Sequence, residues 1–240
     1  MTFLCANMVV RNEADNYLER VLTRLSTQVD MICITDDCSD DNTVEVASSF
    51  DKVKIHSLPK PMFSINEGEL RQASWEWLES NIDQDEPTFI LAIDADEELY
   101  ETTYSLQRII NAERVEIANI MFFHMWNEYQ FRIDGGWRPH GSTRLFRYHK
   151  GDEFLRRKIA CGSEPIRIAE SMRNPQFIRQ HYVNNSGLAM KHLSYIKDED
   201  KRKKHERYMS LDKGDFHALN HIQSIVDPPE RVQLETWSFG

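Results

Sequence analysis

The 240-residue chain contains no apolar run approaching the roughly 20 residues that a membrane-spanning helix needs. Its first residues, MTFLCANMVV, have neither the basic segment nor the cleavage site of a secretory leader and are typical of a buried strand. The four cysteines form no CxxC pair, and Cys5 and Cys33 lie inside apolar runs, where buried, reduced thiols are common. We therefore expect a cytoplasmic protein with no integral membrane segment.

Internal repeats, linkers and low-complexity tracts are also absent from the sequence. Apolar residues make up 40% of the chain and charged residues 28%, an ordinary composition for a soluble globular protein. A chain of this length can bury a substantial core. The sequence therefore predicts a single domain over residues 1–240.

The net charge of −10 is distributed unevenly along the chain. Residues 1–100 hold 7 basic residues against 21 acidic ones, whereas residues 101–240 hold 22 against 18. The first half is thus a poor surface for a polyanion such as nucleic acid. A basic half facing an acidic half suits a ligand that combines a metal ion with phosphate, although two merely solvated faces would have the same composition.

Residues 1–100 alternate between strand and helix patterns. Apolar runs predict strands at 3–10, 31–35, 53–58 and 88–93. Helical spacing predicts helices between them, at 13–25, 43–50 and 69–80. Asn12 is expected to cap the first helix, and Trp77 to lie on the buried face of the third. This alternation predicts an α/β fold with a mostly parallel, Rossmann-like sheet flanked by helices.

The pattern is less regular after residue 100. The expected elements are a helix at 102–112, strands at 115–126, 129–133 and 144–148, and helices between 198 and 226. The sequence DPPER then ends the helical region. Residues 196–240 are therefore expected to form a helical C-terminal tail.

An acidic segment follows the fourth expected strand. In ILAIDADEELYE, residues 90–101, an apolar run is followed at once by Asp94, Asp96 and further carboxylates. Like charges this close repel one another, so water or a cation must offset the repulsion. Two carboxylates one residue apart can bind Mg²⁺ or Mn²⁺. A lone DxD is a weak signal, but a second acidic loop, DDCSDDNT, is expected at the same edge of the sheet, where α/β proteins bind ligands.

Three motifs occur in order in the first 100 residues. They are RNE at 11–13, DDCSDDNT at 36–43 and DAD at 94–96. Together they resemble the motifs of the family 2 glycosyltransferases, which have the glycosyltransferase-A fold. The sequence departs from the usual motif at Cys38, Asp40 and Asn42, which replace Gly, Thr and Gly.

The resemblance implies an enzyme that moves a sugar from a nucleotide diphosphate to an acceptor hydroxyl, with inversion and with Mn²⁺ or Mg²⁺ as cofactor. A uridine nucleotide is expected before a guanosine one. Residues 1–100 would bind the nucleotide sugar, 101–195 would form the acceptor side, and 196–240 the tail. The acceptor, a glycan or another hydroxyl compound, cannot be read from the sequence, and a modified nucleobase in DNA is permitted but not implied.

The resemblance also assigns residues to the donor nucleotide. One of Asp36 and Asp37 would accept a hydrogen bond from the base, although both are also common turn formers. The main chain from Val9 to Arg11 would lie along the base. Arg71 would approach the diphosphate, but a surface arginine paired with a glutamate four residues earlier would give the same pattern.

For the metal ion, the resemblance points to the DAD turn and to a later histidine. Asp94 would contact the ribose or the metal, Asp96 would ligate the metal, and Ala95 between them would contact the donor. His192, in AMKHLSY, would complete the site, and an imidazole ligand suits Mn²⁺ better than Mg²⁺. A purely structural histidine is the alternative.

Transfer with inversion needs a carboxylate that takes the proton of the acceptor hydroxyl. Glu164 is the first candidate because CGSEPI lies where many family members have a short HE-containing motif, and Asp134, before two glycines, is the second. The alternatives are a surface-loop glutamate and a turn-forming aspartate. Lys201, in a basic run over 197–204, would stabilise the leaving group, unless the run is only a solvated helix face.

Three other kinds of protein share some of these features. A phosphatase of the haloacid dehalogenase type places its DxD after the first strand, not the fourth. A sugar nucleotidyltransferase has a glycine-rich loop after its first strand, where this chain has MVVRNEAD. A non-catalytic nucleotide-sugar-binding protein would keep the DxD and lack the base, and the sequence leaves this alternative open.

Overall fold

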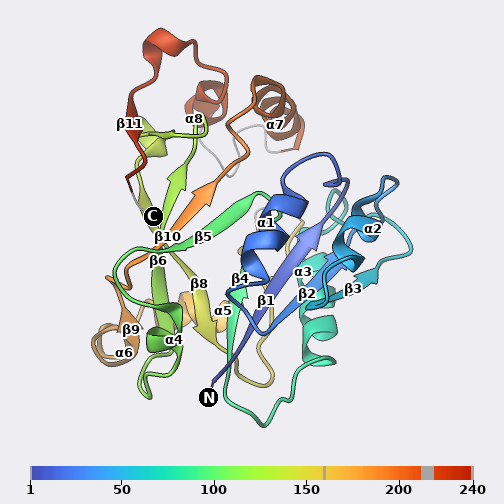
Figure 1. Ribbon diagram of the computed structural model, residues 1–240, viewed down its shortest axis with the longest axis vertical. Coiled ribbons are helices and arrows are strands. Elements are labelled where there is room, and N and C mark those ends of the chain that lie inside the picture. The colour runs from blue at the N-terminus through green and yellow to red at the C-terminus, as the bar shows by residue number, and fades with distance from the viewer. Residues whose placement is uncertain (1, 159–160, 212–218, 239–240) are drawn as a thin grey trace.

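The computed structural model describes residues 2–158, 161–211 and 219–238 (Figure 1). Nine strands of this part form one sheet in the order β3-β2-β1-β4-β8-β6-β10-β5, with β9 paired to β6. Their bounds are Phe3–Val10 (β1), Met31–Asp36 (β2), Val53–Ser57 (β3), Thr88–Ala92 (β4), Glu97–Glu101 (β5), Ile117–His124 (β6), His140–Arg147 (β8), Tyr182–Val183 (β9) and Leu188–His192 (β10). A separate antiparallel pair consists of β7 (Gln130–Arg132) and β11 (Leu234–Thr236).

The strand directions bring several strand ends to one edge of the sheet. β3, β2, β1 and β4 are parallel, as the alternating pattern predicted. β8 is antiparallel to both β4 and β6, and β10 is parallel to β6, so β4, β6 and β10 run in the same direction. The arrows of β1 and β10 in Figure 1 point toward this edge, beyond which α7 and α8 lie.

Helices cover the sheet and its edge. The α-helices are Leu18–Leu25 (α1), Thr43–Ser48 (α2), Glu67–Glu79 (α3), Leu106–Ile110 (α4), Ile166–Ser171 (α5), Pro175–His181 (α6), Asp198–Leu211 (α7) and Leu219–Ser224 (α8). Two short 3₁₀ helices span Gly135–Trp137 and Pro229–Arg231. Within the described residues, no helix combines the length and the apolar character that crossing a membrane requires.

β2 and β4 are buried along their whole length, which explains why their apolar runs are continuous, whereas β3 at the edge of the sheet is partly exposed. On β1, Leu4 and Ala6 belong to the apolar cluster that includes α1, α2 and α4. Cys5 points to the opposite face and packs in a second cluster with Trp75 of α3 and Ile168 of α5. The four cysteines are unpaired, as expected, while the cytoplasmic location stays a prediction.

The start of the first helix differs from the prediction. Asn12 does not cap α1, which begins at Leu18. Instead, Asn12 has a positive φ of 54°, and its side-chain amide donates to Asp40 at 2.7 Å and accepts from the Asp40 main chain at 3.0 Å. The expected cap is therefore a link that joins the RNE loop to the acidic DDCSDDNT loop.

The region after the DAD motif also differs from the prediction. The segment Glu97–Glu101 is a strand, β5, that pairs with β10, and the helix expected at 102–112 is confined to Leu106–Ile110. The sequence EELYE did not predict this strand because charged and apolar residues do not alternate in it, and Glu97 and Glu98 are both buried. The part of the last predicted helices that falls on residues 212–218 lies outside the described residues.

The buried face of α3 is rotated relative to the prediction. Trp75 is fully buried and lies near three aromatic rings, those of Phe146, Tyr148 and Phe154. Trp77, the residue expected in the core, is half-buried, and its ring lies tilted against that of His56 with ring centres 5.2 Å apart. Trp75 therefore anchors α3 on the sheet.

Truncation of these two tryptophans should have unequal effects. We expect Trp75→Ala to lower the free energy of unfolding by about 3–5 kcal/mol, the usual loss for a large buried aromatic residue. Trp77→Ala, the matched control on the same helix, should lose less than about half as much because its ring keeps contact with water. Urea denaturation followed by circular dichroism measures both. Equal losses would contradict the assignment of Trp75 as the anchor.

Candidate active site

The DAD motif lies in the turn that joins β4 to β5. The Asp94 main-chain N–H donates to the Glu97 carboxylate at 2.9 Å, and the Leu193 N–H donates to the Asp96 carbonyl at 2.8 Å. Ala95 is buried between the two aspartates. These bonds fix the turn against the end of β10, so both aspartates are held at the edge of the sheet where the strand ends meet.

Asp94 pairs with two arginines from distant segments. Arg144 of β8 lies 3.2 Å from Asp94, and Arg71 of α3 lies 3.8 Å from it. Burial would raise the pKa of Asp94, but the charges of Arg144 and Arg71 lower it. Arg71 also contacts Glu67 at 3.4 Å, the pair that its sequence spacing suggested, so it belongs both to the site and to the helix.

Asp96 has a different set of partners. It accepts a hydrogen bond from the Ser194 hydroxyl, and its Oδ2 lies 3.3 Å from His192 Nε2 and 3.7 Å from Lys204 Nζ. Burial would raise the pKa of Asp96, but its interactions with His192 and Lys204 and the hydrogen bond from Ser194 hold that pKa well below its usual range. Asp96 is therefore an ionised carboxylate that faces a cation.

Glu97 is a third carboxylate at the same place. It lies opposite His192 in the register of β5 and β10, and its side chain accepts from Arg144 at 2.6 Å. Burial is the main cause that raises the pKa of Glu97 to about 8, since the opposing charge of Arg144 is offset by Asp94 and Asp96. Among Asp94, Asp96 and Glu97, Glu97 is therefore the carboxylate whose ionised form depends most on its partner Arg144.

The crowding of acidic residues in ILAIDADEELYE is thus relieved by cations of the protein itself. Arg71, Arg144 and Lys204 come from α3, β8 and α7, and each lies within 4 Å of one of the two aspartates. Burial alone would lower the pKa of Arg144, but Glu97, Asp94 and Glu164 outweigh it and raise that pKa. The three basic residues are therefore held in place as cations.

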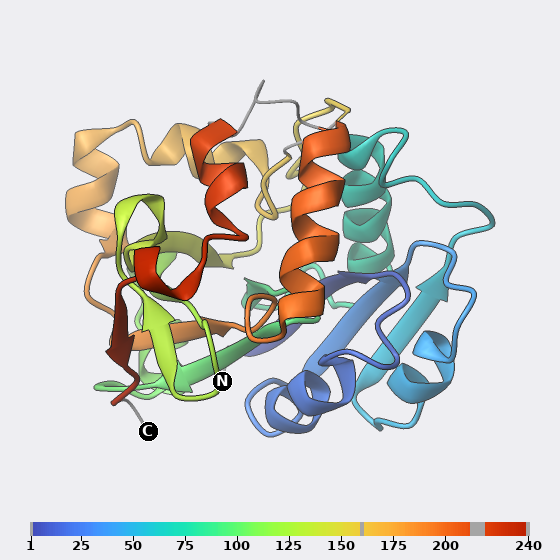
Figure 2. The same ribbon diagram turned by 90° about the horizontal axis from the view of Figure 1, so that it is seen from above.

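Helix α7 brings Lys204 to this point. In the view of Figure 2 the orange helix α7 and the teal helix α3 run in about the same direction, and Figure 1 shows α7 beyond the edge of the sheet. Lys197 Nζ lies 5.1 Å from the ring centre of Tyr17, and Lys201 Nζ lies 4.5 Å from that of Trp126. Lys201, expected at the leaving group, is thus packed against Trp126 and pairs with Asp198 at 3.0 Å. Lys204, about one helical turn further on, is the lysine that contacts Asp96.

The group around Asp96 has the donors that a divalent cation needs. One ligand atom from each of Asp96, Glu97 and His192 lies within 4.8 Å of the other two. The positive charge at this place is the Lys204 ammonium, which lies 3.2 Å from His192 Nε2 and 2.6 Å from Ser194 Oγ. An ammonium has three donors and no lone pair, so it faces the lone pairs that a metal would use. The residues therefore fit a metal ion, and the imidazole favours Mn²⁺.

The two aspartates predicted to bind the nucleobase are almost fully buried at the end of β2. Asp37 accepts hydrogen bonds from the main-chain N–H groups of residues 62 and 63 at 2.5 and 3.0 Å. Asp36 accepts from the Ser39 N–H at 3.1 Å. Cys38, which follows Asp37, has a φ of +62°, a conformation that favours the glycine usual in this motif. Both aspartates thus shape the loop, and their contact with a base stays a prediction.

Val9 and Arg11 lie at the neighbouring strand end. Val9 is half-buried on β1, opposite Thr35 of β2 in the register. The Arg11 guanidinium is 42% exposed and lies 3.9 Å from Asp37. These positions border the ends of β1 and β2, where the resemblance puts the base.

Glu164 lies in a loop that is attached to α3. The Cys161 N–H donates to the Glu67 carboxylate at 3.2 Å, which fixes the loop beside Arg71. Glu164 is half-buried, and its charge contributes to the raised pKa of Arg144 after the effects of burial, Glu97 and Asp94. Within the described part of the chain, no hydrogen bond or ion pair engages its carboxylate. Glu164 therefore has an available carboxylate oxygen near the site.

Asp134 has the opposite character. Both of its oxygens accept from Arg132, at 2.8 and 2.7 Å, and Oδ1 also accepts from the Gln233 N–H at 3.0 Å. The bond from Arg132 lowers the pKa of Asp134. Arg132 is fully buried and also pairs with Asp227 at 2.8 Å. Through these bonds Asp134 connects Arg132 of β7 to Gln233 in the C-terminal segment, which is a structural role.

Several residues of the site had no role in the sequence analysis. Arg144 lies in the segment RLFR, and Glu97 follows the DAD motif, but neither position identifies its partner. Glu13 of the RNE motif is also close, since burial and the charge of Asp96 raise its pKa to about 7. The one available signal was electrostatic, because buried carboxylates need cations. The sequence contains many lysines and arginines and does not indicate which of them contact the carboxylates.

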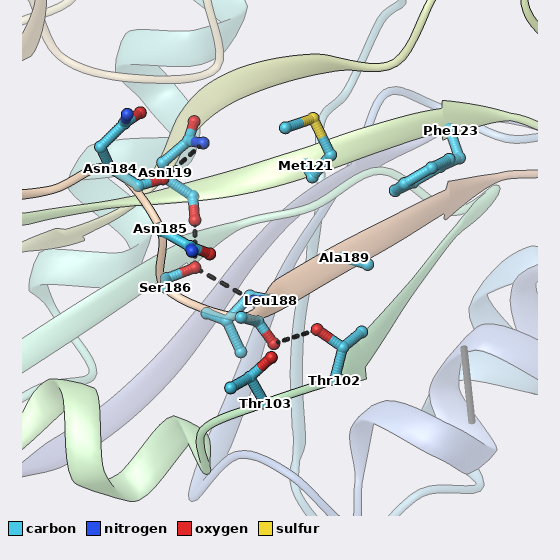
Figure 3. Close-up of a pocket in the computed structure, with 11 residues that line it drawn as sticks. Thr102, Thr103, Asn119, Met121, Phe123, Asn184, Asn185, Ser186, Leu188 and Ala189 are labelled. Carbon is cyan, nitrogen blue, oxygen red and sulfur yellow. Dashed lines mark hydrogen bonds between the residues drawn. The ribbon is translucent and has the colours of Figure 1, made fainter. Parts of the chain in front are cut away.

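A separate hollow of about 250 Å³ lies near the opposite ends of β6 and β10 (Figure 3). Its polar wall is bonded internally: Ser186 donates to the Asn119 carbonyl, and the Asn119 amide donates to the Asn184 carbonyl at 2.9 Å. Thr102 donates to the Gly187 carbonyl at 2.9 Å. These bonds close the loops around the hollow, which is distinct from the site at the DAD turn.

The family of the chain follows from its sequence. A sequence model described as Glycosyl transferase family 2 matches residues 5–169, which include the three motifs, the RLFR strand and Glu164. The chain belongs to glycosyl transferase family 2. The predicted family is thus confirmed, and so is the glycosyltransferase-A fold, with its curled, mostly parallel sheet flanked by helices. No protein of curated function is significantly similar to the chain in sequence.

Solved structures resemble parts or all of this family 2 chain. Glucosyl-3-phosphoglycerate synthase from Mycobacterium tuberculosis, in complex with phosphoglyceric acid, is 18% identical over 52% of this chain and 44% of the synthase, less than half its length, with a TM-score of 0.36. The same synthase with Mn²⁺, uridine diphosphate and phosphoglyceric acid aligns over 100% of this chain and 88% of its own, with 14% identity and a TM-score of 0.49. A 4-diphosphocytidyl-2C-methyl-D-erythritol synthase aligns over 83% and 95%, with 14% identity and a TM-score of 0.42. Likenesses this distant support no statement about the substrate.

Neutralising Lys204 should strengthen the binding of a divalent cation to the nucleotide-free protein. Lys204→Met removes the ammonium that competes for Asp96 and His192, so we expect the Kd for Mn²⁺ to fall by about tenfold or more. Titration of Mn²⁺ followed by electron paramagnetic resonance measures the free ion. Lys203→Met is the matched control, because Lys203 is exposed and pairs only with Glu199 among the described residues. Weaker binding by Lys204→Met would show that the lysine does not occupy the cation position.

Proposed function

We propose that this protein transfers a sugar from a nucleotide diphosphate sugar, with a uridine nucleotide as the first choice, to an acceptor hydroxyl with inversion at the anomeric carbon. The family match supports the reaction class. The observation that carries the assignment of the site is the contact of Asp96, His192 and Lys204 at the edge where the strand ends meet. A carboxylate, an imidazole and a lysine ammonium there suit a metal-bound diphosphate.

The diphosphate would lie between α3 and α7. Arg71 offers a guanidinium whose Nε has no hydrogen-bond partner in the described part of the chain. Lys204 offers an ammonium that can turn from Asp96 to a phosphate oxygen when Asp96 takes another cation. Both charges would stabilise the nucleotide diphosphate as it leaves. In this account Lys204 has the role that the sequence suggested for Lys201.

A divalent cation held by Asp96 and His192, with Glu97 beside them, would neutralise charge on the leaving diphosphate. Asp94 is held by Arg144 and Arg71, so its role is to fix the turn and the arginines, and to face the ribose. In this proposal the second aspartate of the DAD motif binds the metal and the first does not. This division also explains why the first aspartate has a separate pair of cations.

Glu164 is the preferred base. Its carboxylate would take the proton of the acceptor hydroxyl while the acceptor oxygen bonds to the anomeric carbon and the bond from that carbon to the diphosphate oxygen breaks. Glu164 meets two conditions for this role, because it lies near Arg144 and its oxygens are not engaged elsewhere in the described chain. Asp134 does not meet the second condition, since Arg132 donates to both of its oxygens.

Nucleotide and metal should stabilise the protein together. We expect uridine diphosphate with Mn²⁺ to raise the melting temperature. At a hundredfold excess of ligand over its Kd, binding should add roughly 2.7 kcal/mol to the free energy of unfolding. The nucleotide in EDTA should have little effect, because the metal on Asp96 joins the diphosphate to the protein. Differential scanning fluorimetry measures both, with Asp96→Asn as the variant that should lose the Mn²⁺-dependent part. An equal shift in EDTA would remove the metal from the account.

Replacing each candidate base by its amide should distinguish a catalytic residue from one that stabilises the fold. Glu164→Gln should reduce transfer, or slow hydrolysis of the donor sugar, by about 10²–10⁴-fold while binding of uridine diphosphate with Mn²⁺ stays near normal. Asp134→Asn should lower the melting temperature because it weakens the pair with the buried Arg132. The transfer and hydrolysis activities of both variants and of the wild type are measured with a panel of uridine diphosphate sugars. Full activity of Glu164→Gln would exclude it as the base.

The same assay addresses the alternative of a non-catalytic nucleotide-sugar-binding protein. If the wild-type protein binds donor sugars with Mn²⁺ but neither transfers nor hydrolyses any of them, the binding function is favoured. A product that retains the anomeric configuration would contradict the single displacement with Glu164 as base.

A further inference from the structure

His124 forms the direct support of His192. The two residues lie opposite each other in the register of the parallel strands β6 and β10, each at the last position of its strand. Their side chains point to the same face, and the two Nδ1 atoms are 3.0 Å apart. The other nitrogen of His192, Nε2, faces Asp96 and Lys204. His192 is therefore held between a second histidine and the candidate cation site.

The neighbours of Nε2 decide which way the bond between the histidines runs. Lys204 Nζ lies 3.2 Å from His192 Nε2, and an ammonium can only donate. A contact of this kind uses a lone pair on Nε2, whereas Ser194 Oγ at 2.9 Å and Asp96 Oδ2 at 3.3 Å can each accept a proton from that nitrogen. When Lys204 or a metal ion takes the Nε2 lone pair, the single ring proton of a neutral His192 has to be on Nδ1. Among the described residues, the partner of that proton is His124 Nδ1, which must then accept it.

This bond determines what His192 can offer to a cation. A histidine ligates a metal through an unprotonated nitrogen, and the partner of its other nitrogen sets the tautomer. Without an acceptor at His124, the nearby Asp96 carboxylate, 3.3 Å from Nε2, would favour a proton on Nε2 and block the lone pair. The ring would also be free to rotate away from the site.

We propose that His124 is a positioning residue that keeps the Nε2 lone pair of His192 directed at the cation site. This inference rests on the proposed function, since it takes His192 to be a metal ligand. His124 is itself packed between the rings of Trp137 and Tyr195, with ring centres 5.4 and 5.6 Å away, so its Nδ1 is fixed in direction. The acceptor is thus built into the aromatic cluster behind the site.

Two substitutions separate the hydrogen bond from the packing. Asn places an oxygen on Cγ where His has Nδ1, so His124→Asn keeps an acceptor but loses the ring. His124→Phe keeps a ring but loses the acceptor. His140 is the matched control, because its ring lies 5.5 Å from that of His124 and His140→Phe leaves the bond between the two histidines in place.

The first readout is the affinity for Mn²⁺ alone, measured by electron paramagnetic resonance. His124→Phe should weaken binding by about 10–100-fold, the usual effect of losing the partner of a metal-bound histidine. His124→Asn should restore most of the affinity, and His140→Phe should bind as the wild type does. Normal binding by His124→Phe, or equal losses in His124→Asn and His124→Phe, would overturn the proposal.

The second readout does not depend on the metal. Nuclear magnetic resonance of protein with ¹⁵N-labelled histidine reports which ring nitrogen of His192 carries the proton. The wild type and His124→Asn should have it on Nδ1, and His124→Phe should shift it toward Nε2. If the wild type binds no Mn²⁺ but this shift occurs, the proposed metal site fails while the positioning by His124 stands. An unchanged His192 tautomer in His124→Phe would sink the proposal whatever the metal does.

Discussion

The balance of charge at the end of β4 is the interaction on which the rest of the site depends. Asp94, Asp96 and Glu97 are crowded into one turn, and burial makes their mutual repulsion severe. The structure offsets it with cations from three segments that are distant in the sequence. The acidic turn thus fixes where α3, β8 and α7 must meet, and it converts the strand end of an ordinary α/β sheet into a site with defined cation positions.

The two aspartates differ because their cations differ. The two arginines that pair with Asp94 are fixed by further bonds, Arg71 to Glu67 and Arg144 to Glu97. The negative charge of Asp94 is therefore neutralised by the protein itself. The partner of Asp96 is a lysine on a helix that packs through Tyr17 and Trp126. A lysine ammonium is a point charge on a flexible stem, whereas each guanidinium at Asp94 also contacts a second carboxylate. We therefore expect a cation to exchange at Asp96 rather than at Asp94.

Much of this architecture was accessible from the sequence because it rests on local patterns. The four parallel strands, the acidic loops at their ends and the three motifs all follow from apolar runs and turn residues. The failures have a common physical reason, which is that tertiary contacts select among residues that look alike locally. Trp75 rather than Trp77 is buried, Lys204 rather than Lys201 reaches Asp96, and Glu97 begins a strand because β10 lies beside it. The contact of Arg144 with Asp94 could not be predicted for the same reason, because it depends on the antiparallel pairing of β8 with β4.

The central claim is that Asp96 and His192 share one cation position, used by Lys204 in the free protein and by a metal when the nucleotide binds. Crystals soaked with MnCl₂ and uridine diphosphate test it most directly, through an anomalous difference map recorded at the manganese absorption edge. The account predicts a peak at bonding distance from Asp96 Oδ2 and His192 Nε2, with Lys204 moved onto the diphosphate. A map without that peak, with the nucleotide bound and Lys204 still on Asp96, would contradict it.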